Sequence, residues 1–131
     1  MHRGELPKPN IAKTLSIEFT DINPQQGTIE TSFVAGEEFL NPVGQVQGGI
    51  LAAMLDDTMG PALVATLGEN QFAPTLNLSI AFIKAAKPGK IYGKGRVVKK
   101  GKSICYLQGE LLDENGGLLA TGTATAMIRS L

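Results

Sequence analysis

Apolar and polar residues alternate along several short stretches of the chain, and this alternation predicts six β-strands. Two strands come first and four follow later, at residues 14–20, 27–34, 74–84, 90–99, 103–112 and 118–129. Their links are short and rich in turn residues, for example Asn23 to Gly27 and Asn115-Gly116. Because such short links can join only antiparallel neighbours, we expect an antiparallel sheet.

Between the second and third strands the pattern changes to the three-and-four spacing of a helix, over residues 46–67. Its apolar positions recur with this spacing, at Ile50, Leu51, Met54, Leu55, Leu63 and Val64. Pro61 has no N–H to donate to the carbonyl of Asp57, so we expect a kink or a break there. Gly68 is a typical helix stop.

The strands carry many small residues on one face. Gly93 and Gly95 alternate with larger residues in one strand, Gly109 lies in the next, and Gly122 is flanked by alanines in the last. A face of glycine and alanine lets another element approach closely, and the helix is the only candidate. The predicted fold class is therefore α+β, an antiparallel sheet wrapped around one central helix. The other sheet face carries Val, Thr and Leu, and a sheet-to-sheet or edge-to-edge homodimer would cover it.

Length and composition narrow the choice further. A chain of 131 residues fits one domain, residues 1–131, with residues 1–13 as a polar N-terminal tail. At 43% hydrophobic and only 5% aromatic residues, the core must be aliphatic. The single cysteine, Cys105, excludes an internal disulfide, and the single histidine, His2, argues against catalytic triads and multi-histidine metal sites. We expect no metal and no organic cofactor.

The charges balance overall but are unevenly distributed. Twelve basic and twelve acidic residues give a net charge of zero, which does not favour binding to nucleic acid or to a membrane. No Asp or Glu occurs from Gln71 to Gly109, although this window holds eight of the twelve basic residues. The window is either a set of solvated strand faces or a site for a polyanion, and a small phosphorylated ligand fits better than a stacked nucleic acid. No signal peptide or membrane span is visible, so a cytoplasmic location is expected.

Two acidic residues interrupt the apolar helix. Asp56 shares a helical face with Gly49, Ala53 and Gly60, and we expect this small-residue face to pack on the sheet. Asp56 would then be partly buried, whereas Asp57 points about a quarter of a turn away. Asp56 is thus either a structural hydrogen-bond acceptor or a reactive carboxylate.

Gly48 and Gly49 stand close to the predicted start of the helix. Without side chains, they leave backbone N–H groups unshielded at the positive end of the helix dipole. Such a place can bind a carbonyl oxygen that becomes negative, although the same residues also make a tight entry into a helix. Together with the helical carboxylate and the acid-free window, this helix start is a candidate active site.

The stretch from Asn41 through Gln47-Gly48-Gly49, followed by Asp56, resembles the hotdog-fold acyl-CoA thioesterases of the phenylacetate-degradation type. Members of that family have an Asn in the loop, a His-Gly-Gly at the helix start and an acidic residue nine positions after the His. The resemblance runs from about residue 17 to the C-terminus and includes the Lys-Pro-Gly turn at 87–89 and the final strand. It implies a hotdog fold and hydrolysis of an acyl-CoA thioester to a free acid and CoA.

The resemblance also implies roles for individual residues. Asp56 would be the catalytic carboxylate, acting as a general base or as a nucleophile. The N–H of Gly48 would polarise the thioester carbonyl, while Asn41 and Thr75 would help to place the water or the substrate. CoA, which enters as part of the substrate, would be bound through its phosphates by residues of the basic turns, Lys84, Lys87, Lys99, Lys100, Lys102 and Ser103.

Gln47 stands where the family has a histidine. A glutamine can donate and accept hydrogen bonds, but it cannot take up a proton near neutral pH. Two functions therefore stay open, an acyl-CoA thioesterase and a non-catalytic acyl-CoA or lipid binder on the same fold. A hotdog hydratase or dehydratase is disfavoured because those enzymes usually rely on a site histidine.

The candidate residues of one chain are too far apart to hold one thioester. Asp56 lies about two turns beyond the helix start, roughly 10 Å away at a rise of 1.5 Å per residue. In the family, the loop Asn faces the carboxylate across a dimer interface. We therefore expect a homodimer, which could pair again into a tetramer.

Overall fold

The computed structural model describes residues 9–131, so most of the predicted tail, with His2, lies outside the described residues. The first half of the described chain contains α1 (Asn10–Leu15), β1 (Glu18–Asn23), β2 (Thr28–Ala35), the 3-10 turn η1 (Glu37–Phe39) and α2 (Gly48–Val64). The second half contains β3 (Gln71–Phe72), β4 (Thr75–Phe82), β5 (Gly89–Lys100), β6 (Ile104–Leu112), β7 (Leu118–Met127) and β8 (Arg129–Ser130).

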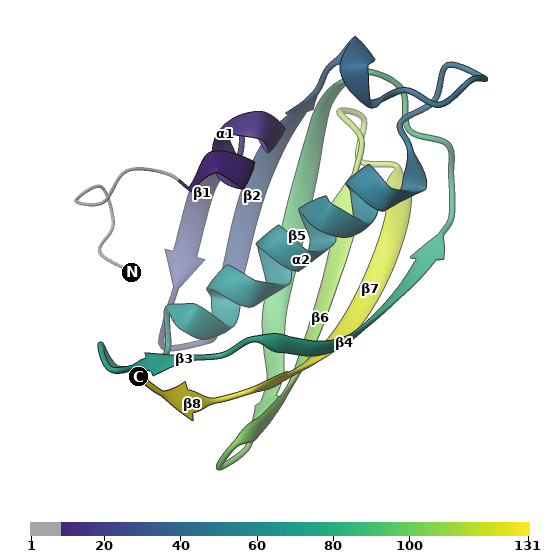
Figure 1. The fold of residues 1–131 in the computed structure, drawn as a ribbon. Coiled ribbons are helices and arrows are strands. Elements are labelled where there is room, and N and C mark those ends of the chain that lie inside the picture. The colour runs from purple at the N-terminus through teal and green to yellow at the C-terminus, as the bar shows by residue number, and fades with distance from the viewer. Residues whose placement is uncertain (1–8) are drawn as a thin grey trace.

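Six of these strands form one antiparallel sheet in the order β1-β2-β5-β6-β7-β4, and α2 lies across one face of it (Figure 1). The α+β prediction is confirmed. Among the described residues β4 pairs only with β7, so it is an edge strand. The strand pair β3–β8 forms a separate two-stranded ribbon. Strands of two residues are too short to show alternation, and the sequence did not predict them.

The close approach of α2 to the sheet depends on the glycines of β5 and β6. A Cβ atom at Gly95 would lie 3.0 Å from the backbone oxygen of Thr58, and one at Gly109 would lie 2.8 Å from Cγ of Met59. The contact at Gly109 is too short for a real Cβ atom unless Met59 shifts, and the contact at Gly95 is tight against the helix backbone, so glycine at both positions lets the helix sit this close. The predicted contact between the helix and a glycine-rich sheet face is confirmed.

The face of α2 that packs on the sheet is not the small-residue face that we expected. Its buried residues are mostly large and apolar, namely Leu51, Met54, Leu55, Thr58, Met59, Ala62 and Leu63. A Cβ atom at Gly49 or at Gly60 would meet nothing within 4 Å. The prediction was wrong because large side chains bury more apolar area, and the sheet already supplies the small residues that close contact needs. The small-residue face of α2, with Asp56, is only partly buried within residues 9–131, and it is the uncovered face of the helix.

The two helices also differ from the prediction, one by its presence near the N-terminus and the other by its continuity at Pro61. α1 occupies residues that we assigned to the tail and to the first strand, since Ala12 and Leu15 are buried in the core. Ser16, in the left-handed conformation with φ 53°, ends α1, and β1 starts only at Glu18. α2 continues through Pro61 to Val64 without a break, because a proline in the last helical turn removes a single hydrogen bond.

Within residues 9–131, no helix is both long enough and apolar enough to cross a membrane.

Candidate active site

The uncovered face of α2 runs beside the edge strand β4. At one end of β4, Oγ1 of Thr75 donates a hydrogen bond of 2.9 Å to Oδ1 of Asp56. At the other end, the ring of Phe82 packs on Gly48, where a Cβ atom would lie only 3.2 Å from the ring Cζ. Because Gly48, Ala52 and Asp56 are spaced by four residues, they form one row along the helix on the side that faces this strand.

Asp56 is a half-buried carboxylate with one oxygen in use. The hydroxyl of Thr75 binds Oδ1, while Oδ2 has no hydrogen-bond partner among the described residues. A carboxylate that is fixed through one oxygen can accept a proton from a water, or attack a carbonyl, with the other. The structure thus brings together two of the predicted site residues, Asp56 and Thr75, which are 19 positions apart in sequence.

Gly48 is the first residue of α2, and its N–H has no hydrogen-bond partner in the described part of the chain. The helical hydrogen bonds begin at the carbonyl of Gln47, which accepts from the N–H groups of Ile50 and Leu51 at 2.9 and 3.2 Å. The side chain of Gln47 is exposed and does not cap the helix. The N–H of Gly48 is therefore available to an acceptor oxygen at the positive end of the helix.

Asn41 shapes the loop that leads into α2. Its Oδ1 accepts hydrogen bonds of 3.1 Å from the N–H groups of both Val43 and Gln45. Both lone-pair positions of Oδ1 are thereby used, so only the Nδ2 amide can act outside the loop, and it can act only as a donor. Within residues 9–131, no hydrogen bond joins Asn41 to Asp56 of the same chain.

Asp57 differs from Asp56 in its surroundings. Partial burial raises the pKa of the Asp57 carboxyl above its usual value, and the neighbouring charge of Asp56 raises that pKa further. No side chain among the described residues donates a hydrogen bond to Asp57. The two features of a candidate base are therefore divided between the two residues. Burial raises the pKa of Asp57, whereas the hydrogen bond that positions a carboxylate is made to Asp56.

The predicted CoA-binding residues lie at opposite ends of α2 (Figure 1). Lys84 and Lys87 flank Ala86, whose carbonyl accepts a 2.8 Å hydrogen bond from Val46 just before the helix. The others lie around the turn between β5 and β6, beyond the C-terminal end of the helix, at Lys99, Lys100, Lys102 and Ser103. One chain does not gather these six residues into one binding site.

Two of these lysines already have partners in the chain. Nζ of Lys84 forms a salt bridge of 2.8 Å with Asp113, and this contact, led by the hydrogen bond, lowers the pKa of the Asp113 carboxyl. Nζ of Lys100 donates a 2.9 Å hydrogen bond to the carbonyl of Thr66, just beyond the end of α2. Both lysines thus stabilise the fold, and the side chains of Lys87, Lys99, Lys102 and Ser103 are left without a partner among the described residues.

Arg129 is a basic residue that the sequence pattern did not associate with this site. The N–H of Ile128 donates a 2.7 Å hydrogen bond to the carbonyl of Ser103, which places Arg129 beside the turn that carries Lys102. Arg129 lies outside the acid-free window, so charge counting along the chain could not find it. Only the hydrogen bond between Ile128 and Ser103, which joins the segment after β7 to the β5–β6 turn, reveals its position.

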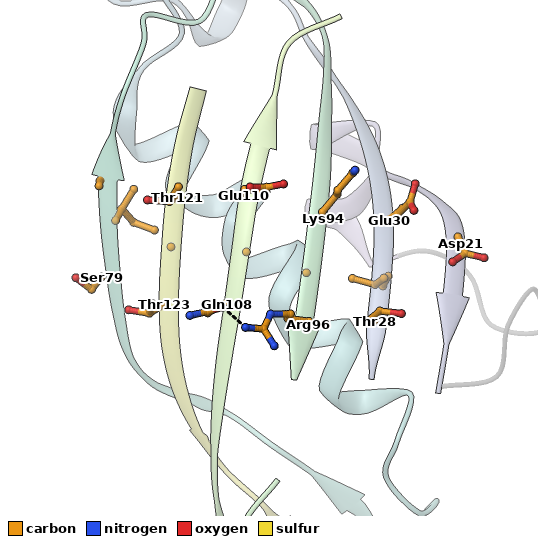
Figure 2. A pocket seen from close by; sticks show the side chains of 16 residues that line it. Asp21, Thr28, Glu30, Ser79, Lys94, Arg96, Gln108, Glu110, Thr121 and Thr123 are labelled. Atoms are coloured by element: carbon orange, nitrogen blue, oxygen red, sulfur yellow. Dashed lines mark hydrogen bonds between the residues drawn. The ribbon is translucent and has the colours of Figure 1, made fainter. Parts of the chain in front are cut away.

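A shallow hollow of about 860 Å³ lies on the sheet face opposite α2 (Figure 2). One row of polar side chains crosses five strands there, at Ser79, Thr123, Gln108, Arg96 and Thr28. Nη2 of Arg96 donates a 2.7 Å hydrogen bond to Oε1 of Gln108 within this row. None of the predicted site residues lines the hollow. In the described part of the chain, no group of three His, Cys, Asp or Glu side chains could hold a metal ion.

The chain is similar to known proteins over most of its length. Residues 44–120, more than half of the chain, match the family model of the thioesterase superfamily. The phenylacetic acid degradation-related protein of Ralstonia eutropha JMP134 is 43% identical and superposes with a TM-score of 0.92, over 95% of this chain and 94% of that one. The E. coli PaaI protein, at 17% identity, shares the fold with a TM-score of 0.84, over 92% of this chain and 84% of that one.

A curated relative has an assigned activity in its name. The human acyl-coenzyme A thioesterase 13 is 27% identical over 112 residues, which cover 82% of this chain and 78% of that protein. The chain therefore belongs to the thioesterase superfamily, and its fold is the hotdog fold. It is a thioester hydrolase by class.

Proposed function

We propose that the protein hydrolyses acyl-CoA thioesters, with Asp56 as the base or nucleophile and the N–H of Gly48 as the donor to the carbonyl oxygen. The observation that carries this proposal is the hydrogen bond from Thr75 to Asp56, which fixes a carboxylate on the uncovered face of α2. The name of the human relative, an acyl-coenzyme A thioesterase, supports CoA as the thiol of the substrate.

The proposed chemistry uses the two groups of the site that have no hydrogen-bond partner among the described residues, Oδ2 of Asp56 and the N–H of Gly48. Oδ2 of Asp56 takes a proton from a water, and the water oxygen attacks the thioester carbonyl carbon. The carbonyl oxygen becomes negative and is stabilised by the N–H of Gly48 at the helix start. When the carbonyl re-forms, the C–S bond breaks and CoA leaves as a thiolate that takes up the proton. As a nucleophile, Asp56 would instead form an acyl anhydride that water then hydrolyses.

We propose that each site contains residues of two chains. Asp56 and Gly48 lie at opposite ends of the helical row, next to Thr75 and Phe82 at opposite ends of β4. Antiparallel pairing of β4 with the partner's β4 about its middle would place Thr75 opposite the partner's Phe82. That arrangement brings Asp56 to the partner's Gly48 and the donor amide of the partner's Asn41.

The surface of β4 supports this pairing. β4 is an edge strand, and unpaired edge groups are a ready template for another strand. Two of its large apolar side chains are also exposed, Leu76 at 51% and Phe82 at 56%. Pairing would cover the edge and Leu76, and it would place Phe82, the last residue of the strand, at the boundary between the two chains beside the small-residue face of α2.

The same dimer would bring the two groups of basic residues together. In one chain, Lys102 lies at the Asp56 end of the sheet and Lys87 at the Gly48 end. The antiparallel arrangement turns the partner's Lys87 towards Lys102, so that phosphates of one CoA could contact both. We propose Lys87, Lys99, Lys102 and Ser103 as the contacts to the CoA phosphates, because their side chains are exposed and unpaired among the described residues.

The direct test is a panel of acyl-CoA thioesters with detection of the released thiol. The proposal predicts release of free CoA with at least one acyl group. Binding of acyl-CoA without any turnover would contradict it and would favour a non-catalytic binder. In that case Gln47→His decides whether the site lacks only a titratable group, since restored hydrolysis would identify an enzyme scaffold with one missing part.

A further inference from the structure

Phe82 is unusually placed for a large aromatic residue. It is the last residue of the edge strand, and its side chain is 56% exposed although one edge of the ring packs on Gly48. At the contact, a Cβ atom on Gly48 would lie 3.2 to 3.7 Å from three ring carbons of Phe82. The rest of the ring is therefore available to a ligand.

The backbone around Phe82 is held on both sides. Phe82 pairs with Ala120 of β7, and the N–H groups of Ile83 and Lys84 both donate to the carbonyl of Leu119, at 2.9 and 3.1 Å. The helix start is tied to the same segment by the bond between Val46 and Ala86. The backbone of Phe82 and the start of α2 are therefore held close together, and the ring rests on Gly48 from a fixed attachment point.

The ring borders the place where a thioester carbonyl would bind. It packs on the side of Gly48 where a Cβ atom would stand, and the same residue carries the free N–H. An acyl group whose carbonyl oxygen accepted from this N–H would thus bind close to the ring. In the proposed dimer, Phe82 also lies opposite the partner's Thr75, which holds the partner's Asp56. The ring would thus contact the substrate between the two reacting parts of the site.

We infer that Phe82 is a specificity-determining residue that selects acyl groups unbranched at the carbon next to the carbonyl, an inference that rests on the function proposed above. A flat ring accepts a methylene group against its face, whereas a methyl branch on that carbon would project into the ring. A well-packed site has little space for an added methyl group, and one such group changes kcat/KM by about 10- to 200-fold in hydrophobic pockets.

The test compares two isomeric substrates, hexanoyl-CoA and 2-methylpentanoyl-CoA, which have the same number of carbons and differ only in branching. The wild type should prefer hexanoyl-CoA in kcat/KM by about tenfold or more. Phe82→Ala should bring the ratio towards one, and Phe82→Leu should give an intermediate ratio. Ile83→Ala is the matched control: this neighbouring side chain is equally exposed at 56%, does not contact Gly48, and should leave the ratio unchanged.

The outcomes separate this inference from the proposed function. An unchanged ratio in a folded Phe82→Ala variant that still hydrolyses hexanoyl-CoA overturns the role of Phe82 and leaves the hydrolase intact. A wild-type kcat/KM ratio near one for the two isomers also overturns the role of Phe82. If the wild type hydrolyses neither isomer, their Kd values test the inference instead, and the proposed function fails only if no acyl-CoA of the panel is hydrolysed. A wild-type Kd preference for hexanoyl-CoA that Phe82→Ala removes supports the inference, and a preference that survives contradicts it.

Discussion

The two sides of α2 use large and small residues in opposite ways. On the side that packs on the sheet, Leu55 and Met59 are fully buried, and the small residues belong to the sheet, at Gly95 and Gly109. On the other side, the small residues belong to the helix and surround Asp56, which bonds to the edge strand. The first side stabilises the chain, whereas the second leaves space beside a carboxylate. Substitutions on the two sides should therefore change different measurable quantities.

The largest expected effect is on turnover, from Asp56→Asn. The amide keeps the shape of the side chain and its hydrogen bond to Thr75 but removes the base or nucleophile. We expect kcat to fall by about a hundredfold or more, the scale of a lost general base, with little change in acyl-CoA affinity. Asp57→Asn is the matched control and should retain most activity.

A purely structural role for Asp56 would give a different result. The melting temperature of Asp56→Asn would then fall, and turnover would follow the amount of folded protein. Circular dichroism melts of both variants, measured beside the thiol assay, separate the two cases.

The second expected effect is on stability, from Gly95→Ala on the packed side. The added Cβ would lie 3.0 Å from the backbone oxygen of Thr58, so the helix must shift. We expect a loss of about 1–3 kcal/mol in the free energy of unfolding, typical of overpacking. Urea denaturation measures it. The control is Gly60→Ala, which meets nothing within 4 Å and should leave stability unchanged or raise it by up to about 1 kcal/mol. Equal losses in both variants would contradict the distinction between the two sides.

The sequence predicted much of this fold, for identifiable physical reasons. Alternation is strong in long strands, so β2 and β4 to β7 were found with small errors at their ends. The glycines at 93, 95 and 109 correctly indicated a close contact with the helix. The face of α2 was misassigned because three-and-four spacing identifies faces but does not say which one is buried. The alternation that suggested a strand at residues 14–20 was overridden by burial of Leu15 from a short helix.

The site was only partly predictable. The spacing that selected Asp56 over Asp57 could be read from the chain, and the bond from Thr75 to Asp56 supports that choice. Lys84 bonds to Asp113 and Lys100 bonds to Thr66, which lie 29 and 34 residues away in the sequence. No local sequence pattern can predict contacts over such separations. The contact of Phe82 with Gly48 is of the same kind.

A smaller effect is expected from Lys102→Glu, on substrate affinity. Lys102 is exposed and unpaired within the described residues, so reversal of its charge should act through the ligand. We expect KM for an acyl-CoA to rise roughly 3- to 10-fold, since one exposed ion pair contributes up to about 1 kcal/mol and reversal adds repulsion. KM for a short thioester without the nucleotide should not change. Lys94→Glu, on the opposite sheet face, is the control. Equal effects of Lys102→Glu on both thioesters would mean that Lys102 is an ordinary solvated surface residue and does not bind CoA.

The smallest effect concerns the pH dependence of stability through Asp57. Its folded pKa is raised by burial and by Asp56, so its contribution to stability is fully present below the unfolded value of 3.8 and is lost as pH rises through the folded pKa. Asp57→Asn removes this titration. The melting temperature of the variant relative to the wild type should therefore be higher at pH 7 than at pH 3. A variant that is relatively less stable at pH 7 would contradict this, and thermal melts at both pH values suffice.

The central claim, that two chains build each site, is tested most directly by mixing two variants, each of which we expect to be inactive because it lacks one group of the site. Asp56→Asn leaves Gly48 and Asn41 intact, and Asn41→Asp keeps the oxygen that shapes the loop but loses the donor amide. After co-refolding, half of the dimers are mixed and each mixed dimer has one complete site, so activity should return to about a quarter of the wild-type value. If the mixture stays as inactive as its two components, although mixed dimers have formed, each site lies within one chain and the account is wrong.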